Sequence, residues 1–176
     1  MIALKDRDLF RQQALIGGNW RDASTRATVD VVDPASQEVL GTIPDMGRDE
    51  TRAAINVAAD AFKRWKAKAH AERAALLERW YELMRRHEQD LALLLTLEQG
   101  KPLAESFGEI RYGASFVKWF AEEARRINGS TIPSPSADRR ILVLKEPRGK
   151  AEAKAPRHDD SSETPDRPRT RGRRAG

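Results

Sequence analysis

Few of the side chains that commonly perform chemistry occur at useful spacings in this sequence. Its 176 residues include no cysteine, which excludes disulfides, thiolate metal ligands and a cysteine nucleophile within this chain. Its three histidines, His70, His87 and His158, are far apart, and none has a neighbour at the spacing typical of metal ligands. Spacing alone therefore identifies no catalytic residue and no metal site.

Two glycine-containing segments invite comparison with phosphate-binding loops. Gly100-Lys101 lacks the upstream glycine of such a loop, and Pro102 stands where a magnesium-binding Ser or Thr is needed. The pair Gly17-Gly18 is not followed by a helical pattern, and two glycines between short β-prone segments favour a hairpin turn. We therefore assign neither segment to cofactor binding, and the sequence shows no cofactor-binding residue.

The elements that would position any site are short strands followed by helices. Residues 10–46 carry short β-prone segments separated by Gly, Pro and Asp. Apolar spacings of three and four then predict three helices, over about residues 48–68, 71–97 and 102–127. Gly100 is expected to end the second helix, and Pro102 fits the first turn of the third. A β-prone apolar run follows at residues 141–144.

The end of the chain differs in composition from the rest. Residues 150–176 contain Ala and Pro but no other aliphatic and no aromatic side chain, so they are predicted to form a disordered basic tail. The alternative is an arm for nucleic acid built on five arginines, although no aromatic residue accompanies them for base stacking. These arginines are Arg167, Arg169, Arg171, Arg173 and Arg174.

No segment has the length and apolarity of a membrane span, since the longest purely apolar run covers residues 91–95. The first 13 residues also lack the apolar stretch of a secretory signal. We therefore expect a cytoplasmic protein without a membrane partner. The formal net charge of +5 comes mostly from the tail, and the rest of the chain is nearly balanced. Nucleic acid is therefore not an expected partner.

One long ordered block carries a resemblance to a known family. It contains the segments LEQGKPLAE (97–105), GEIRYGASF (108–116) and WFAEEA (119–124). Supporting segments are IGGNW (16–20), VDPA (32–35), FKRW (62–65), RAALL (73–77), GSTIP (129–133) and KEP (145–147). Over about residues 8–147 the chain resembles the NAD(P)-dependent aldehyde dehydrogenases, most closely the succinate-semialdehyde dehydrogenases.

The resemblance implies an α/β fold that is α-rich in this chain. Residues 1–149 would form the N-terminal part of the cofactor-binding domain, with short strands and then three long helices that would cover a parallel sheet. A bridging strand used in oligomerisation would begin near residues 140–146. The family assembles into homo-oligomers, and the sequence leaves the oligomeric state of this chain open.

The resemblance also implies a reaction, the conversion of succinate semialdehyde or a similar small-molecule aldehyde to its acid with NAD or NADP. In the family a cysteine thiolate attacks the aldehyde, hydride passes to the nicotinamide and a glutamate activates water. The similarity stops at Arg148, where the family pattern has Val. The parts that bind the cofactor and perform catalysis would follow that point, so we predict a truncated or frameshifted chain that is inactive alone and binds neither NAD nor NADP tightly.

Within the similar region, the family's third helix borders the aldehyde entrance, which makes Tyr112 and Phe116 candidates for lining the substrate tunnel. The alternative is that both pack against neighbouring helices. Arg111 is a further candidate for holding a substrate carboxylate. Two other classes of function stay open from the sequence: a non-catalytic helical interaction module, and a nucleic-acid binder that uses the arginine-rich tail.

Overall fold

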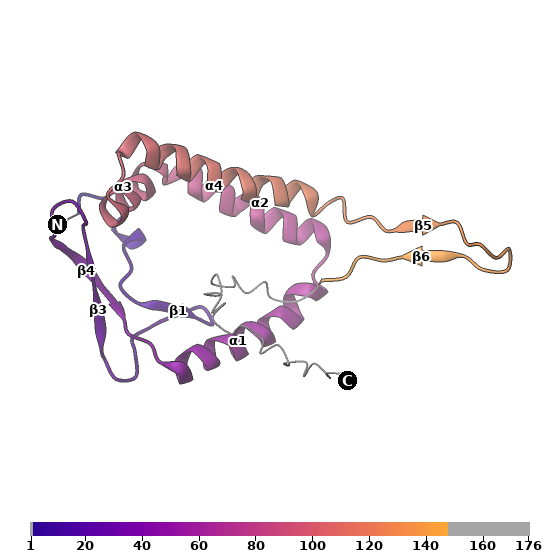
Figure 1. The fold of residues 1–176 in the computed structure, drawn as a ribbon, viewed down its shortest axis with the longest axis horizontal. Coiled ribbons are helices and arrows are strands. Elements are labelled where there is room, and N and C mark those ends of the chain that lie inside the picture. Colours follow the sequence, from indigo (N-terminus) through magenta and orange to yellow (C-terminus); the bar gives the residue numbers. More distant parts are fainter. Residues whose placement is uncertain (1, 148–176) are drawn as a thin grey trace, which may run out of the picture.

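The computed structural model describes residues 2–147. The predicted disordered tail over 150–176 lies outside the described residues. Helices α2 (His70–Arg86), α3 (Glu88–Gln99) and α4 (Leu103–Glu123) form one layer, in which α4 runs back along α2 (Figure 1). Helix α1 (Arg48–Ala67) runs apart from this layer and shares no extensive interface with another described element. The helix-rich arrangement confirms the predicted fold class.

The strands form three separate antiparallel hairpins. They are β1 (Ala14–Ile16) with β2 (Asn19–Arg21), β3 (Thr28–Val32) with β4 (Val39–Pro44), and β5 (Ser130–Ile132) with β6 (Ile141–Val143). A single-turn 3₁₀ helix, η1 (Arg7–Leu9), precedes them. Gly17 and Gly18 have φ values of 63° and 82°, the backbone that a two-residue hairpin turn requires. The predicted turn is therefore confirmed.

The Glu50 carboxylate accepts several hydrogen bonds at the start of helix α1. The Glu50 side chain accepts a hydrogen bond from the Gly47 amide at 3.0 Å. Its other oxygen accepts from the amide and hydroxyl of Ser24, at 3.1 and 2.5 Å. These bonds, led by that from the Ser24 hydroxyl, lower the pKa of Glu50 to about 2. The start of α1 is thereby attached to the loop between the first two hairpins.

The predicted second helix, over residues 71–97, is divided into α2 and α3. The break lies at His87, whose φ and ψ of −98° and 17° depart from helical values. The bend turns α3 onto α4, and it lets Asp90 reach the N-terminal segment. The apolar spacing continues across the break, so periodicity alone predicts one helix where the structure has two.

The helical layer packs through small residues. Ala74 of α2, Ala92 of α3, and Ala114 and Ala121 of α4 are fully buried. Small side chains let the three helix backbones approach closely, which leaves little room for large apolar side chains between them. Gly100 ends α3 in the left-handed conformation with φ 77°, as predicted. Many large apolar residues are instead exposed on the outer faces of the helices.

The hairpin of β5 and β6 projects away from the rest of the molecule (Figure 1). The predicted β-prone run thus forms a strand, and its residues Leu142 and Leu144 are 66% and 69% exposed. Among the described residues, no helix has the length and apolar character needed to cross a bilayer.

Candidate functional site

The two predicted tunnel residues lie one turn apart on α4. The rings of Tyr112 and Phe116 meet edge to face, with centroids 4.8 Å apart and an interplanar angle of 83°. The two residues are 65% and 47% exposed. Fully buried Ala114 shows that the layer contacts a different face of α4. Among the described residues, the two rings thus contact each other rather than being buried against α2 or α3, and their role in a tunnel stays a prediction.

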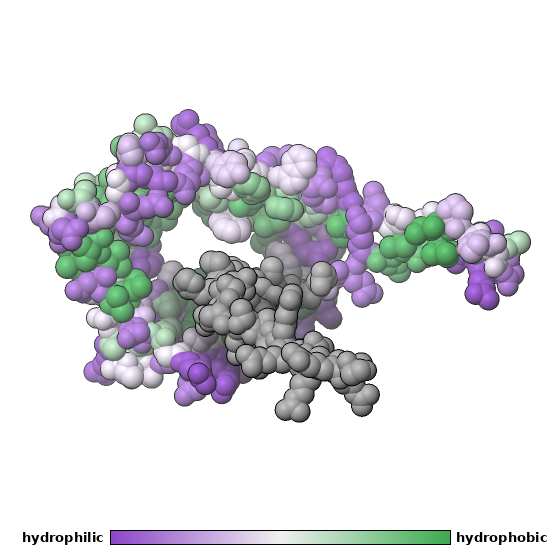
Figure 2. All heavy atoms as spheres, in the orientation of Figure 1, coloured by the Kyte–Doolittle hydropathy of each residue, from purple (hydrophilic) through white to green (hydrophobic). Residues whose placement is uncertain are grey.

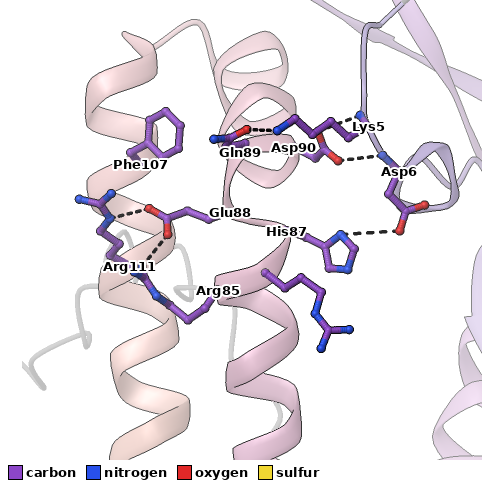
Figure 3. A pocket seen from close by; sticks show the side chains of 10 residues that line it. Lys5, Asp6, Arg85, His87, Glu88, Gln89, Asp90, Phe107 and Arg111 are labelled. Atoms are coloured by element: carbon purple, nitrogen blue, oxygen red, sulfur yellow. Dashed lines mark hydrogen bonds and ion pairs between the residues drawn. The ribbon is translucent and has the colours of Figure 1, made fainter.

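Arg111 is engaged by a carboxylate of the same layer. Its Nε lies 2.5 Å from Glu88 Oε1, and Arg85 Nη1 lies 2.7 Å from Glu88 Oε2 (Figure 3). The guanidinium of Arg111 also lies 5.9 Å from the ring centre of Phe107. The Glu88 side chain is only 11% exposed, so both arginines neutralise a largely buried charge. The Arg111 side chain is itself 62% exposed and bonds Glu88 through Nε, so its role in holding a substrate carboxylate stays a prediction.

A second carboxylate holds the N-terminal segment against α3. Asp90 accepts hydrogen bonds from the backbone amides of Lys5 and Asp6, at 3.0 and 2.9 Å (Figure 3). These bonds lower the pKa of Asp90, the Lys5 amide having the largest effect. Beside them, Lys5 Nζ donates to the Gln89 side chain at 2.5 Å, and His87 Nδ1 lies 3.6 Å from an Asp6 carboxylate oxygen.

These groups surround a cavity of about 480 Å³. Its lining is dominated by charged side chains from the N-terminal segment, the junction of α2 and α3, and α4. Most of them are already paired with one another, and no buried side-chain polar atom among the described residues lacks a hydrogen-bond partner. The cavity therefore lies where three segments of the chain meet. No buried side-chain polar atom of its lining is left without a partner and available to bind a ligand.

Two of the described helices begin at acidic side chains. A diphosphate is commonly bound by the free amides at a helix N-terminus. The first turn of α1 faces the Glu50 carboxylate, and that of α3 carries Glu88 and Asp90. Within residues 2–147, no three His, Asp or Glu side chains converge to hold a metal ion.

Sequence reasoning missed the roles of Glu88 and Asp90. Both are acidic residues in the first turn of α3, the place where negative charge is favoured by the helix dipole. The acidic residues Glu88 and Asp90, which follow His87 closely, therefore indicated that a helix could start there. The contacts with Lys5, Asp6 and Arg111 join positions far apart in sequence, and no local pattern indicates them.

Comparison with known proteins shows which family most of this sequence matches. Residues 20–156 match the family model described as "Aldehyde dehydrogenase family". The chain is 54% identical over 155 residues to the NADP-dependent succinate-semialdehyde dehydrogenase of Escherichia coli K12, covering 88% of this chain and 32% of the relative. A glutarate-semialdehyde dehydrogenase of Pseudomonas putida shows the same identity and the same two shares.

A solved structure extends the similarity to the fold. The crystal structure of succinate-semialdehyde dehydrogenase from Burkholderia pseudomallei matches with a TM-score of 0.80 and 54% identity, covering 82% of this chain and 30% of that one. The chain thus spans about a third of the length of the curated relatives it matches. The family match covers most of the sequence, and the arrangement of helices and hairpins agrees with a solved member. The chain belongs to the aldehyde dehydrogenase family.

Proposed function

We propose that residues 2–147 supply the first part of an enzyme that oxidises a short aldehyde carrying a carboxylate at its far end, with NAD or NADP as the oxidant. The observation that carries the proposal is the 54% identity to both a succinate-semialdehyde and a glutarate-semialdehyde dehydrogenase. Both named substrates join an aldehyde to a carboxylate through a short chain of methylene groups. The reaction consumes the aldehyde, water and the oxidised cofactor, and it yields the acid, the reduced cofactor and a proton.

The role proposed for α4 is to form one wall of the substrate tunnel with Tyr112 and Phe116. The exposure of both rings supports this role, because neither is buried among the described residues and each can face a further part of the fold. Their mutual edge-to-face contact holds them as a pair. Two adjacent aromatic rings suit contact with the methylene chain of the substrate. The carboxylate of the substrate requires cationic groups elsewhere in the enzyme.

The 176-residue chain is proposed to be inactive by itself. Oxidation of an aldehyde to an acid by this route requires a nucleophile, a hydride acceptor and a base for water. The chain contains no cysteine to serve as that nucleophile, and helices α1 and α3 begin at acidic side chains, which suit a diphosphate poorly. The nucleophile, the base and the hydride acceptor's site therefore have to come from further polypeptide. The relatives have such polypeptide outside the matched third of their length.

A chimera tests the proposed function directly. Residues 1–147 would replace the matched region of the Escherichia coli relative, and NADPH formation would be followed by absorbance with succinate semialdehyde and with butanal. We expect turnover of succinate semialdehyde, a lower kcat/KM for butanal, and no NADPH from the 176-residue chain alone. A folded chimera that prefers butanal would overturn the proposed substrate class. Turnover by the chain alone would overturn its proposed inactivity.

A further inference from the structure

The segment between α4 and β5 contains the dipeptide Asn128-Gly129, at the base of the projecting hairpin (Figure 1). The side-chain amide of an asparagine is an electrophile, and the backbone nitrogen of the next residue is near enough to attack it and close a small ring. A glycine in that next position has no Cβ to obstruct the approach, and its backbone adopts conformations that other residues avoid. The dipeptide is therefore a place where spontaneous deamidation of the chain is chemically favoured.

The fold leaves both reacting groups available. Asn128 is exposed, and within residues 2–147 its side chain makes no hydrogen bond and the Gly129 amide donates none. Neither residue belongs to a helix or a strand. The hairpin that follows stands clear of the other described residues (Figure 2), and neither β5 nor β6 shares an extensive interface with another described element. The backbone at this position is therefore able to reach the geometry of attack without breaking a hydrogen bond of the fold.

The two other asparagines of the sequence, Asn19 and Asn56, are constrained. Asn19 lies in β2, donates its side-chain amide to the Gly17 carbonyl at 3.4 Å, and precedes the bulky Trp20. Asn56 lies within α1 and precedes the β-branched Val57, whose amide belongs to the hydrogen-bonded helix. A large next residue and an engaged amide both oppose ring closure. These two asparagines therefore serve as references within the same molecule.

We propose that Asn128 is a modification site at which spontaneous deamidation yields aspartate and isoaspartate. The Gly129 nitrogen forms a bond to Asn128 Cγ, the bond from Cγ to Nδ2 breaks, and ammonia leaves with the proton that the Gly129 nitrogen gives up. Water then opens the resulting succinimide. Opening at Cγ gives aspartate, and opening at the backbone carbonyl carbon gives isoaspartate, in which the chain continues through Cγ. Overall, water enters and ammonia leaves, and no group is oxidised or reduced.

Formation of isoaspartate should disturb the pairing of β5 with β6. It adds a methylene group to the backbone directly before Gly129, whose position is crowded, because a Cβ added there would collide with the Val143 carbonyl oxygen. The next residue, Ser130, pairs with Val143 in the hairpin. An isolated two-stranded hairpin has little stability to lose, so a displaced Gly129 should separate this first pair. Aspartate adds a negative charge at the same place without lengthening the backbone.

Peptide mapping of the full 176-residue chain tests the modification. Trypsin cleavage after Arg126 and Arg139 releases residues 127–139, in which Asn128 carries the only side-chain amide. The purified chain would be incubated at mildly alkaline pH, and the mass of this peptide followed with time, with synthetic aspartate and isoaspartate peptides as chromatographic standards. We expect Asn128 to react at least about tenfold faster than Asn19 and Asn56, and isoaspartate to be among the products. Equal rates at the three asparagines would overturn the proposal.

A synthetic peptide of residues 127–139 separates the effect of the fold from the reactivity of the dipeptide. Because the fold leaves both groups available, we expect the full chain to react within about threefold of the rate of the peptide. A much slower reaction in the full chain would show that the fold protects Asn128 and would overturn the proposal.

Asn128→Gln is the matched variant for the effect on the hairpin, because its longer side chain closes the ring far less readily. In the same incubation this variant should keep its mass and the NMR chemical shifts of β5 and β6. The unsubstituted chain should lose the shifts of the paired Ser130 and Val143 as isoaspartate accumulates. Unchanged shifts in a chain converted to isoaspartate would overturn the proposed disturbance of the hairpin.

Discussion

The hydroxyl groups of Thr96 and Ser106 lie 2.8 Å apart and join the end of α3 to the start of α4. Ser106 is fully buried, so its hydroxyl depends on Thr96 rather than on water for a partner. The bond spans the connection that contains Gly100 and Pro102. It therefore fixes the angle at which α4 returns along the helical layer.

Replacement of Ser106 by Ala should weaken this junction. The substitution leaves the Thr96 hydroxyl without its partner and should lower the free energy of unfolding by about 1 kcal/mol. Urea titration followed by helical circular dichroism measures the change. Ser115→Ala is the matched control, because Ser115 is exposed and donates only to the Tyr112 carbonyl of its own helix. An equal loss in both variants would contradict a specific role for the junction.

Substitution of two glycines should have opposite effects. Gly100 has φ 77°, and a Cβ there would lie 2.8 Å from Pro34 Cγ, so Gly100→Ala should destabilise the chain by about 1–2 kcal/mol. Gly108 lies within α4, and a Cβ added there would meet no neighbouring atom within 4 Å, so Gly108→Ala should stabilise the chain by up to about 1 kcal/mol. The same urea titration applies to both. A stabilising Gly100→Ala would show that the left-handed cap is unimportant.

The pKa of Glu50 provides a test by pH. Its carboxylate is held by Ser24 and Gly47, which lowers the pKa from 4.5 to about 2. A pKa lowered in the folded state means that the carboxylate contributes stability above pH 4.5 and loses that contribution as the pH falls toward 2. NMR titration of the Glu50 carboxyl carbon measures this value. Ser24→Ala should move it upward, toward 4.5, because the Ser24 hydroxyl has the largest effect.

Asp90 is expected to hold the N-terminal segment in place. Asp90→Asn replaces one of the two accepting oxygens by an NH₂ group, so one of the two backbone amides, that of Lys5 or that of Asp6, loses its acceptor and should exchange with solvent roughly tenfold faster. Hydrogen exchange by NMR measures the effect. Asp60→Asn is the control, since Asp60 pairs with Lys63 on exposed α1. Unchanged exchange at both amides in Asp90→Asn would mean that other contacts hold the segment.

The tunnel role of α4 can be tested in the chimera. Tyr112→Ala and Phe116→Ala should each raise KM for succinate semialdehyde about tenfold with a smaller change in kcat, because they remove apolar contacts made before chemistry. Ser115→Ala, on the same helix and exposed, should leave both constants near those of the unsubstituted chimera. A loss of kcat alone in the aromatic variants would argue against a binding role.

The sequence by itself predicted the elements that depend on local chemistry. The Gly17-Gly18 turn, the start of α1 and the Gly100 cap follow from backbone preferences and short-range spacing, and the structure confirms all three. The ordered motifs over about residues 8–147 identified the family, which the comparisons confirm. These features require no knowledge of distant contacts.

Only the tertiary structure showed the break at His87, the pairing of Glu88 with Arg111 and the attachment of the N-terminal segment to Asp90. Apolar spacing continues through His87 and gives no sign of the break, and the contacts of Glu88 and Asp90 join positions more than twenty residues apart. The structure also showed which apolar side chains stay exposed. Helix α4 has apolar residues on two faces, and the packing of α2 and α3 buries Ala114 and leaves Phe116 exposed.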